Sequence, residues 1–293
     1  MFYLTPRLNL TCIYATVSHI RKANLSNYRY NEGDIMTQEL YNRPDIYDIV
    51  YKKENSQELT EHYKNVLGSK SITTIHDCSI GTGQLTFALC DLGYKVSGSD
   101  LSGEMLENAR RNAEDRDLEI DLLKCDFREI AKSTNKTFDC VMSTGNSLAH
   151  VSNEDVKRTL ESMTQLVADG GYIYLDTRNW DKILDTKQRF FCYNPFFRGE
   201  ERINLTQVWD YISEEQIVFN LLYTFEKKNR IYKQEEVRTT YHPLRKAVII
   251  DHLNGLGYEE VELDNFMNPN VTEFSEMDWY SICAKKRTED DCN

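Results

Sequence analysis

Hydrophobic residues recur with helical spacing where the regular pattern of the chain begins. Over residues 57–68, Leu59, Tyr63 and Leu67 stand four positions apart, and Gly68 follows directly. Residues spaced by four share one face of an α-helix, and a glycine commonly ends a helix. The pattern therefore predicts an amphipathic helix over residues 57–68.

Beyond this helix the chain changes repeatedly between strand-like and helix-like texture. Short runs rich in β-branched and aromatic residues predict strands over residues 72–79, 94–100, 118–127, 138–144 and 172–179. Amphipathic stretches between them predict helices over residues 83–93, 102–115 and 153–171. Ser102 is expected to cap the second helix, and a glycine pair to close the third. This alternation indicates right-handed crossovers and a parallel sheet covered on both faces.

The texture changes after residue 185. Residues 207–240 are rich in Val, Ile, Tyr, Phe and Thr and are interrupted by polar pairs, which predicts an antiparallel ribbon that serves as a lid or insertion. A helix over residues 244–257 and strands over residues 258–264 and 279–286 then complete the first pattern. The predicted fold class is thus α/β, a Rossmann-like seven-stranded sheet with an antiparallel β insertion.

These elements predict a division of the chain into consecutive parts. The main α/β core with an N-terminal helical cap would span residues 36–185, the insertion residues 186–243, and the rest of the core residues 244–286. Residues 287–293 would form a disordered tail, and residues 1–35 a leader.

The leader has an unusual charge pattern. Its first 31 residues hold four basic side chains and no acidic one. A targeting segment is one interpretation, although the apolar stretch is too broken for a secretory signal. The favoured interpretation is an upstream extension that catalysis does not need, with the main fold beginning near Met36.

The composition indicates a folded, acidic protein. Hydrophobic residues make up 40% of the chain and aromatic residues 11%, enough to bury a sizeable core. The formal net charge of -12 repels phosphate backbones, so the sequence predicts no nucleic-acid partner and favours a small-molecule substrate. No stretch approaches the roughly 18 apolar residues of a membrane span, so no membrane partner is expected. A homo-oligomer is left open.

The eight cysteines indicate neither a metal centre nor a disulfide framework. No two of them form a C-x-x-C pair, and none stands beside a histidine at metal-ligand spacing. Several lie in apolar runs such as residues 139–143, where a thiol packs as a small hydrophobic group. The sequence therefore predicts a reducing, cytoplasmic environment and no metal.

The first predicted strand ends in a turn that is suited to a ligand. Residues 77–83 read Asp-Cys-Ser-Ile-Gly-Thr-Gly and lead into a helix, and glycine lets backbone approach a ligand closely because it has no Cβ. Structural turns, dinucleotide folds and P-loops all use glycine here. No Gly-Lys-Ser/Thr follows, which disfavours a P-loop, and the full G-x-G-x-x-G is absent, which weakens a dinucleotide site.

An acid, Asp100, ends the second predicted strand. A carboxylate at this place can accept both hydroxyls of a ribose, as it does in NAD-binding folds, so the acid alone does not separate NAD from S-adenosylmethionine. Together, D-x-S-x-G-x-G at 77–83, GSDLSGEML at 98–106 and KCDF at 124–127 resemble the class I methyltransferases, which bind S-adenosylmethionine.

That resemblance implies a set of cofactor-binding residues near the strand ends. Asp126 would bond the adenine amino group, and Phe127 would pack on the adenine ring; ordinary turn and core roles are the alternative for both. The other implied cofactor-binding residues are Tyr63, Asp77, Ser79, Gly81, Gly83, Asp100, Leu101, Met105, Thr144 and His150.

Further segments resemble the glycine and glycine/sarcosine N-methyltransferases. They are GNSLAH at 145–150, DTRNWDKIL at 176–184 and YHP at 241–243. Tyr51 and Tyr63 have the spacing of two N-terminal site tyrosines of that family. The resemblance covers roughly residues 45–285.

Two departures from that family concern the acceptor more than the reaction. FFCYNPFF at 190–197 replaces a segment rich in lysine and tyrosine, which leaves the role of Tyr193 open. The loop between residues 68 and 72 is also short.

The resemblance assigns the acceptor side of the site to Asn146, Arg178, Tyr51, Tyr223 and Tyr241. Arginine offers paired donors in a geometry that matches a carboxylate, and Arg178 follows a strand end, where substrates of open α/β sheets lie. A surface ion pair is the alternative for Arg178. Asn146 would orient the amine or the carboxylate of the substrate, or else only form a turn.

The tyrosines would offer hydroxyl groups and ring faces to a cationic sulfonium, although each alone is better explained by packing or by a surface position. His150 would lie close to the cofactor without acting as a base.

The resemblance therefore implies an S-adenosylmethionine-dependent N-methyltransferase that acts on glycine, sarcosine or a similar small amine bearing a carboxylate. Methyl transfer from a sulfonium is an in-line displacement with a good leaving group, so the protein mainly aligns the reactants and excludes water. Three alternatives stay open: an N- or O-methyltransferase with another small acceptor, a non-catalytic S-adenosylmethionine-binding protein, and an NAD-dependent oxidoreductase.

Overall fold

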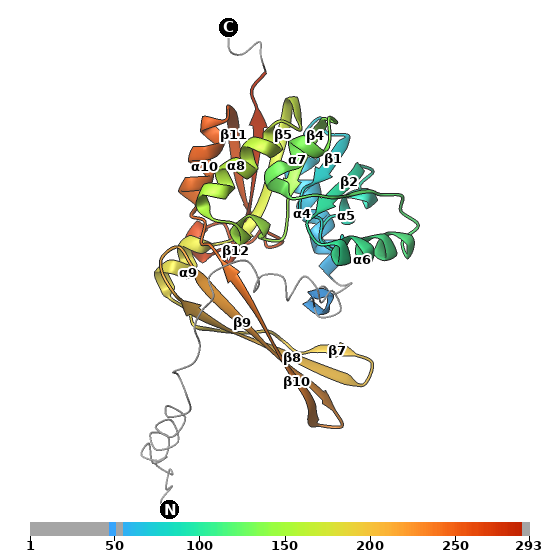
Figure 1. Cartoon of the computed structure of the whole chain (residues 1–293), viewed down its shortest axis with the longest axis vertical. Coiled ribbons are helices and arrows are strands. Elements are labelled where there is room, and N and C mark those ends of the chain that lie inside the picture. The colour runs from blue at the N-terminus through green and yellow to red at the C-terminus, as the bar shows by residue number, and fades with distance from the viewer. Residues whose placement is uncertain (1–46, 51–54, 289–293) are drawn as a thin grey trace, which may run out of the picture. The chain divides into compact units, whose positions relative to one another are not determined.

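A seven-stranded sheet forms the centre of the computed structural model, which describes residues 47–50 and 55–288 (Figure 1). The strands of this sheet are β1 (Thr74–Asp77), β2 (Lys95–Asp100), β3 (Asp121–Lys124), β4 (Phe138–Ser143), β5 (Val167–Arg178), β11 (Tyr258–Asn265) and β12 (Trp279–Lys286). Their order is β11-β12-β5-β4-β1-β2-β3. Strands β1 to β5 pair in parallel, whereas β12 runs antiparallel to both β5 and β11. The predicted α/β class and the seven strands are confirmed.

Helices connect these strands, as the alternating texture predicts. The α-helices are α4 (Asn55–Leu67), α5 (Ala88–Asp91), α6 (Gly103–Glu114), α7 (Ile130–Ser133), α8 (Asn153–Thr164), α9 (Trp180–Thr186) and α10 (Lys246–Gly255). The short 3-10 helices are η1 (Asp48–Val50), η2 (Phe127–Glu129), η3 (Ser147–His150) and η4 (Phe274–Glu276). Ser102 caps α6 as predicted, because its hydroxyl accepts the Met105 N–H at 3.2 Å.

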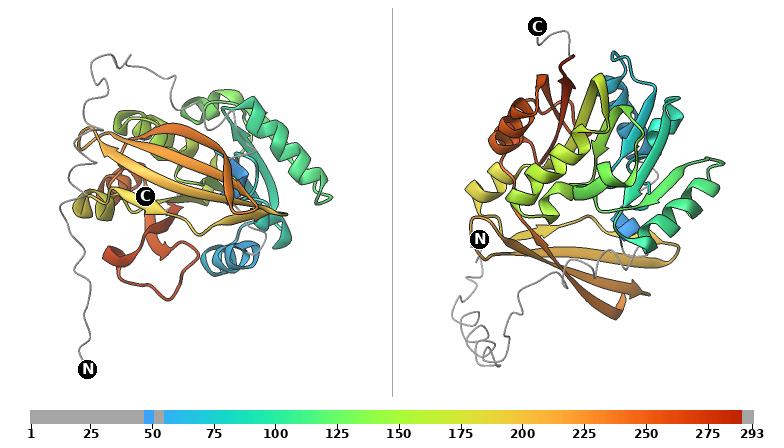
Figure 2. Two further views of the ribbon diagram at one scale, coloured as in Figure 1. Left: turned by 90° about the horizontal axis from the view of Figure 1, so that it is seen from below. Right: turned by 45° about the horizontal axis from the view of Figure 1, so that its top comes forward.

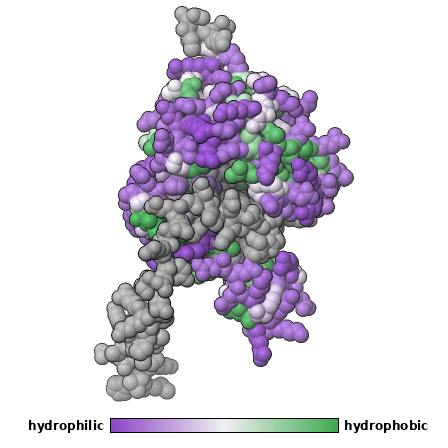
Figure 3. Space-filling model, in the orientation of Figure 1, coloured by the Kyte–Doolittle hydropathy of each residue, from purple (hydrophilic) through white to green (hydrophobic). Residues whose placement is uncertain are grey.

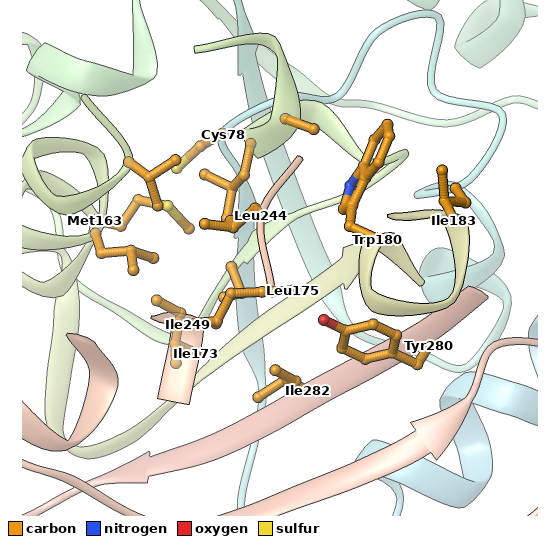
Figure 4. Packing of buried hydrophobic residues seen from close by; sticks show 14 of the residues in the cluster. Cys78, Met163, Ile173, Leu175, Trp180, Ile183, Leu244, Ile249, Tyr280 and Ile282 are labelled. Atoms are coloured by element: carbon orange, nitrogen blue, oxygen red, sulfur yellow. The ribbon is translucent and has the colours of Figure 1, made fainter. Parts of the chain in front are cut away.

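Both faces of the sheet are buried under helices. Helices α8 and α10 cover one face, in a cluster of buried side chains where Ile173, Leu175, Ile249 and Ile282 point towards one another (Figure 4). Helix α4 covers the other face through Leu59, Tyr63 and Leu67, which share one side of the helix. Burial of apolar area on both faces stabilises a parallel sheet of this kind. Because β1 to β5 run parallel, their carboxyl ends lie at one edge.

Two predicted helices differ from the structure. The helix expected over residues 83–93 is only α5, because residues 83–87 form tight turns that begin at Gly83, whose φ is +82°. The helix expected over residues 153–171 ends at Thr164, and β5 runs through the glycine pair. That pair lies in an irregularity of the β4–β5 pairing, where a bulge accommodates the extra residues of β5.

A second sheet holds the remaining strands, as the two views of Figure 2 show in yellow and orange. Its strands are β6 (Phe190–Cys192), β7 (Phe196–Arg198), β8 (Glu201–Tyr211), β9 (Ile217–Lys227) and β10 (Arg230–Tyr241). All of them pair antiparallel, in the order β10-β9-β8-β6 with β7 beside β8. The predicted antiparallel ribbon is confirmed and begins earlier than residue 207.

Aromatic contacts join this second sheet to the carboxyl ends of β4 and β5. The ring of Phe219 lies 6.0 Å from that of Trp180, and the ring of Tyr241 lies 4.5 Å from that of His150. The His242 N–H donates to the Ala149 carbonyl at 2.7 Å. The second sheet therefore forms a wall beside the strand ends.

The face shown in Figure 3 is largely hydrophilic, with hydrophobic residues in separate small patches. None of the helices in the part of the chain that the structure describes is long and apolar enough to cross a membrane. Residues 1–35, the end of the tail and Tyr51 lie outside the described residues, so the predictions made for them stay predictions.

Candidate functional site

Asp77 anchors the turn that follows β1. The side chain is fully buried, and its Oδ2 atom accepts the hydroxyls of Thr86 at 2.6 Å and Thr144 at 2.7 Å. Its Oδ1 atom accepts the Ser79 N–H at 3.0 Å. Burial raises the pKa of Asp77, although these donors oppose the shift. Asp77 thus holds the turns after β1 and β4 together. A direct contact with a ligand stays a prediction, because both carboxylate oxygens already accept donors of the protein.

Ser79 and Thr144 complete the connection between these two turns. The Ser79 hydroxyl accepts the Thr144 N–H at 3.0 Å and lies 3.1 Å from the Ser143 hydroxyl. The edge of the sheet between β1 and β4 is thus held by a closed set of hydrogen bonds.

Asp100 holds the glycine turn from the end of β2. Its Oδ2 accepts the Gly81 N–H at 2.9 Å, and its Oδ1 accepts the Ser102 N–H at 2.8 Å. Burial raises the pKa of Asp100 to about 6. The next residue, Leu101, leaves 60% of its surface exposed.

The two glycines of the turn have different roles. A Cβ atom on Gly81, where φ is +56°, would meet only the Tyr47 hydroxyl, at 3.9 Å. A Cβ atom on Gly83 would lie 2.2 Å from the ring of Phe87. Gly81 therefore leaves open space at the turn, whereas Gly83 is required for packing against the protein itself.

Tyr47 and Asp48 lie over this turn, a contact that the sequence pattern did not predict. The Asp48 carboxylate accepts the Thr82 hydroxyl at 2.6 Å. Tyr47 lines a small cavity together with Ser79, Ile80, Thr82, Gln84, Leu85, Thr144 and Gly145. The N-terminal part of the described chain thus forms one wall of the cavity at the strand ends.

Asp126 and Phe127 follow the end of β3, as predicted. Burial raises the pKa of Asp126, but bonds to Arg128 outweigh this effect and lower the pKa overall. Asp126 accepts the Arg128 N–H at 2.9 Å and a guanidinium N–H at 2.6 Å. Arg128 also donates to Asp155 at 3.0 Å. A bond from Asp126 to adenine stays a prediction, because Arg128 already engages both oxygens of this carboxylate. Phe127 is half-buried against the core.

Three other predicted cofactor residues have mainly buried surroundings. Met105 and Tyr63 have no exposed surface, and the Tyr63 ring lies 5.7 Å from that of Tyr174. His150 lies against Tyr241, and burial lowers its pKa to about 4, so the imidazole is neutral at pH 7. Cofactor contacts by these residues stay predictions.

Asn146 stands at the end of β4 with its amide orientation determined. Its backbone is left-handed, with φ at +63°. Its Oδ1 atom accepts the Thr177 hydroxyl at 2.9 Å, the Arg178 N–H at 3.1 Å and the Trp180 indole N–H at 3.0 Å. Three donors on one atom identify it as the oxygen. The Nδ2 atom is buried and has no hydrogen-bond partner among the described residues, so it is available as a donor.

Arg178, at the end of β5, lies among aromatic rings. Its guanidinium carbon lies 5.8 Å, 5.5 Å and 5.1 Å from the ring centres of Trp209, Phe219 and Trp279. Its closest polar side-chain contact is the Tyr193 hydroxyl at 3.5 Å. No ion pair joins Arg178 to an acid within residues 47–50 and 55–288. The alternative of a surface ion pair therefore finds no support in the described structure.

The tyrosines predicted for the acceptor side come from the second sheet. Tyr223 is buried on β9 and shares a face with Phe219. Tyr241 ends β10, with its ring 5.5 Å from that of Trp180, and burial raises its pKa to about 12. Both lie on or beside the aromatic wall that contacts Arg178, and their role in binding stays a prediction.

Asp176 belongs to the same edge and was not predicted as a site residue. It is 3% exposed, and its Oδ1 atom accepts the Gly145 N–H and the Trp279 indole N–H, each at 2.9 Å. Burial raises its pKa to about 7. No signal in the linear sequence marks this contact, because Trp279 lies on β12, far along the chain.

These residues fit S-adenosylmethionine. Gly81 and Gly145 both have positive φ, and a Cβ atom on Gly81 or on Gly145 would lie 3.9 Å or 3.7 Å from the Tyr47 hydroxyl, beside the small cavity that Gly145 lines. Asp100 stands at the strand end suited to a ribose, and the exposed Leu101 offers an apolar surface for a base. The carboxylate acceptor, the glycine turns and the apolar surface of this edge thus suit a nucleoside that carries an amino acid.

Comparison with known proteins agrees with this geometry. Residues 75–171 match the model of a methyltransferase domain. The chain is 28% identical to a glycine/sarcosine N-methyltransferase of Aphanothece halophytica over 91% of this chain and 99% of that protein. It is 25% identical to a glycine/sarcosine/dimethylglycine N-methyltransferase of Actinopolyspora halophila over 83% of this chain, but spans only 42% of that longer protein.

The fold is similar to that of solved methyltransferases. The crystal structure of an S-adenosylmethionine-dependent methyltransferase from Clostridium acetobutylicum superposes with a TM-score of 0.63. The match covers 94% of this chain and 99% of that one, at 17% sequence identity. This likeness includes the second sheet as well as the central one, because the coverage extends over nearly the whole chain.

Proposed function

We propose that this chain, which has a methyltransferase domain and the fold of S-adenosylmethionine-dependent methyltransferases, methylates the nitrogen of a small amine that bears a carboxylate. Glycine and sarcosine are the first acceptors to test. S-adenosylmethionine is the cofactor and supplies the methyl group.

The environment of Arg178 is the observation that carries this proposal. Its guanidinium is half-buried among rings with no acid beside it in the described part of the chain. A partly desolvated cation without a counter-charge favours an anionic ligand, and the planar guanidinium favours a carboxylate.

Asn146 strengthens the preference for a carboxylate over an amine. Its oxygen already accepts three donors, so only its N–H groups are available to a ligand. An ammonium group offers no acceptor to these N–H groups, whereas a carboxylate does. The Arg178 N–H bond to Asn146 keeps the two groups next to each other.

The aromatic wall would strengthen this binding and protect the reaction. Trp209, Phe219 and Tyr241 lie around the guanidinium and the neighbouring strand ends. Exclusion of water lowers the local dielectric constant, which strengthens a carboxylate–guanidinium pair. An acceptor held by its carboxylate would have its amine aligned in a single direction, which is the main requirement of an in-line displacement.

The cofactor side would be held by groups from other strands. Asp100 would accept the ribose hydroxyls, Leu101 would contact the base, and the turns at Gly81 and Gly145 would leave room for the methionine part. The acceptor groups on β5 and the second sheet would thus be separable from the cofactor groups on β1 and β2.

A reducing, cytoplasmic location is part of the same proposal. Cys78, Cys125, Cys140 and Cys283 are buried free thiols that pack in the core, as is usual in reducing compartments.

Turnover of matched acceptors with labelled S-adenosylmethionine tests the proposal. Glycine and sarcosine should accept the methyl group, whereas methylamine, which is glycine without its carboxylate, should be much poorer. Preference for methylamine or for an alcohol would contradict the proposal and move the chain to a different acceptor within the same family.

A further inference from the structure

Asp176 connects the two groups proposed to bind the acceptor. Its Oδ1 atom accepts the Gly145 N–H after β4 and the indole N–H of Trp279 on β12. Its backbone carbonyl accepts the Asn146 N–H at 3.3 Å. One buried residue on β5 therefore holds the strands on both of its sides.

Each of these contacts involves a residue that lies next to one of the two groups proposed to bind the methyl acceptor. Gly145 and Asn146 form the turn from which the Asn146 amide projects. Trp279 pairs with Arg178 across the β5–β12 ladder, and its ring lies 5.1 Å from the guanidinium carbon. A shift of Gly145 would therefore move the Asn146 amide, and a shift of Trp279 would move the ring beside the Arg178 guanidinium.

The second oxygen of Asp176 shows that packing alone does not explain this residue. Oδ2 is buried and has no hydrogen-bond partner among the described residues. A buried carboxylate with an unsatisfied oxygen is costly, and burial raises its pKa accordingly. Residues kept at such a cost commonly serve a function.

We propose that Asp176 is a positioning residue of the acceptor site: its Oδ1 atom holds the Gly145–Asn146 turn and the Trp279 indole, and so directs the Asn146 donors and the Arg178 guanidinium towards one carboxylate. This inference rests on the proposed function for its ligand. Asp176 touches neither reactant and acts through these neighbours.

The three tryptophans of the chain supply a direct test, because each indole N–H reports on one hydrogen bond. Trp279 donates to Asp176, Trp180 donates to Asn146, and Trp209 donates to Gln207 in the second sheet at 3.0 Å. In an NMR spectrum of the full chain labelled with ¹⁵N at the indoles, Trp-to-Phe variants would assign the three signals.

Asp176→Ala should shift the signals of Trp279 and of Trp180, while that of Trp209, whose indole N–H bonds to Gln207, moves least. Asp176→Asn should leave all three near their wild-type positions, because its amide oxygen can accept both donors. Ser281→Ala is the matched control, since Ser281 is buried beside Asp176 on β12 but joins neither Gly145 nor Trp279. An unmoved Trp180 signal in Asp176→Ala would overturn the proposal.

Calorimetric titration of sarcosine in the presence of S-adenosylhomocysteine gives the second readout. Asp176→Ala should weaken sarcosine binding about tenfold, the equivalent of one lost hydrogen bond, and Asp176→Asn should restore most of it. Unchanged binding in Asp176→Ala, or equal losses in Ser281→Ala, would contradict a positioning role.

Failure of the proposed function has a different signature. If the wild-type chain binds neither sarcosine nor glycine, the acceptor is wrong, while the indole signals still test whether Asp176 orders the site. If Asp176→Ala does not fold, Trp279→Phe replaces it, since it removes one donor and keeps a ring beside Arg178. Sarcosine binding should then fall a few fold, and an unchanged affinity would overturn the link between Asp176 and Arg178.

Discussion

The cofactor half and the acceptor half of the site are built differently. At the ends of β1 and β2, the carboxylates of Asp77 and Asp100 are bound by donors of the protein itself. At the ends of β4 and β5, Asn146 and Arg178 have donors that no described residue uses fully. The first half is ordered by its own hydrogen bonds, whereas the second carries charge and donors that a ligand would satisfy.

This difference implies that substitutions in the two halves have separable effects. A change in the turns after β1 and β2 should disturb folding or cofactor binding, because these bonds support backbone. A change at Arg178 should disturb the acceptor alone, because its rings come from the second sheet and from β12.

Within the cofactor half, substitution of the two turn glycines should have different consequences, and the largest loss of stability is expected at Gly83. Gly83→Ala places a Cβ against the Phe87 ring at a positive φ, so the free energy of unfolding should fall by about 2–4 kcal/mol. Gly81→Ala meets open space and should lose only about 1 kcal/mol of stability, yet it should weaken S-adenosylhomocysteine binding. Urea denaturation and calorimetry would measure both. Similar stability losses in the two variants would contradict the assigned roles.

Asp100→Ala should weaken binding of the cofactor without changing which methyl acceptor is preferred. The loss of a charged acceptor for the ribose should cost about 1.5–3 kcal/mol of S-adenosylhomocysteine binding. At saturating cofactor the ranking of glycine over methylamine should remain that of the wild type. Undiminished cofactor binding would remove Asp100 from the site.

A smaller effect concerns the pH dependence of stability. The pKa of Asp176 is about 7 in the folded chain against about 3.8 when unfolded, so the folded state binds the proton more tightly between these values. Stability of the wild type should therefore fall as pH rises towards and through 7. Between pH 6 and 8 the titration of Asp176 should lower the free energy of unfolding by about 1 kcal/mol.

Asp176→Asn isolates this effect, since it removes the titrating group and keeps the Oδ1 acceptor. The unfolding free energy of this variant, relative to that of the wild type, should rise from pH 6 to pH 8 and become constant above. A difference that is independent of pH would show that Asp176 does not titrate in this range.

Much of the site was predictable because parallel strands bring their ends to one edge. Asp100, Asn146 and Arg178 each follow a recognisable strand, so their shared location followed from the alternating pattern and the motifs. The second sheet was likewise visible in the β-rich texture after residue 185.

The Asp176–Trp279 bond was not predictable, because it depends on the register between β5 and β12. The same holds for Asp48 on Thr82, which joins a short N-terminal element to the glycine turn. Gly83 has a packing role that the motif does not reveal, because a Cβ atom there would meet the Phe87 ring, and its contact with the cofactor stays a prediction. The glycine pair after α8 resembled a helix end but belongs to a strand irregularity.

The central claim, that Arg178 binds the carboxylate of the acceptor and takes no part in cofactor binding, is tested most directly by two titrations of Arg178→Lys. Lysine keeps the charge but loses the paired donors, so sarcosine affinity in the presence of S-adenosylhomocysteine should fall by roughly one to two orders of magnitude, from about 1.5–3 kcal/mol of lost bonding. S-adenosylhomocysteine itself should bind as in the wild type. Arg202→Lys is the control, because that arginine pairs with Glu226 in the second sheet, away from the strand ends. Wild-type sarcosine affinity in Arg178→Lys, or an equal loss for both ligands, would contradict the account.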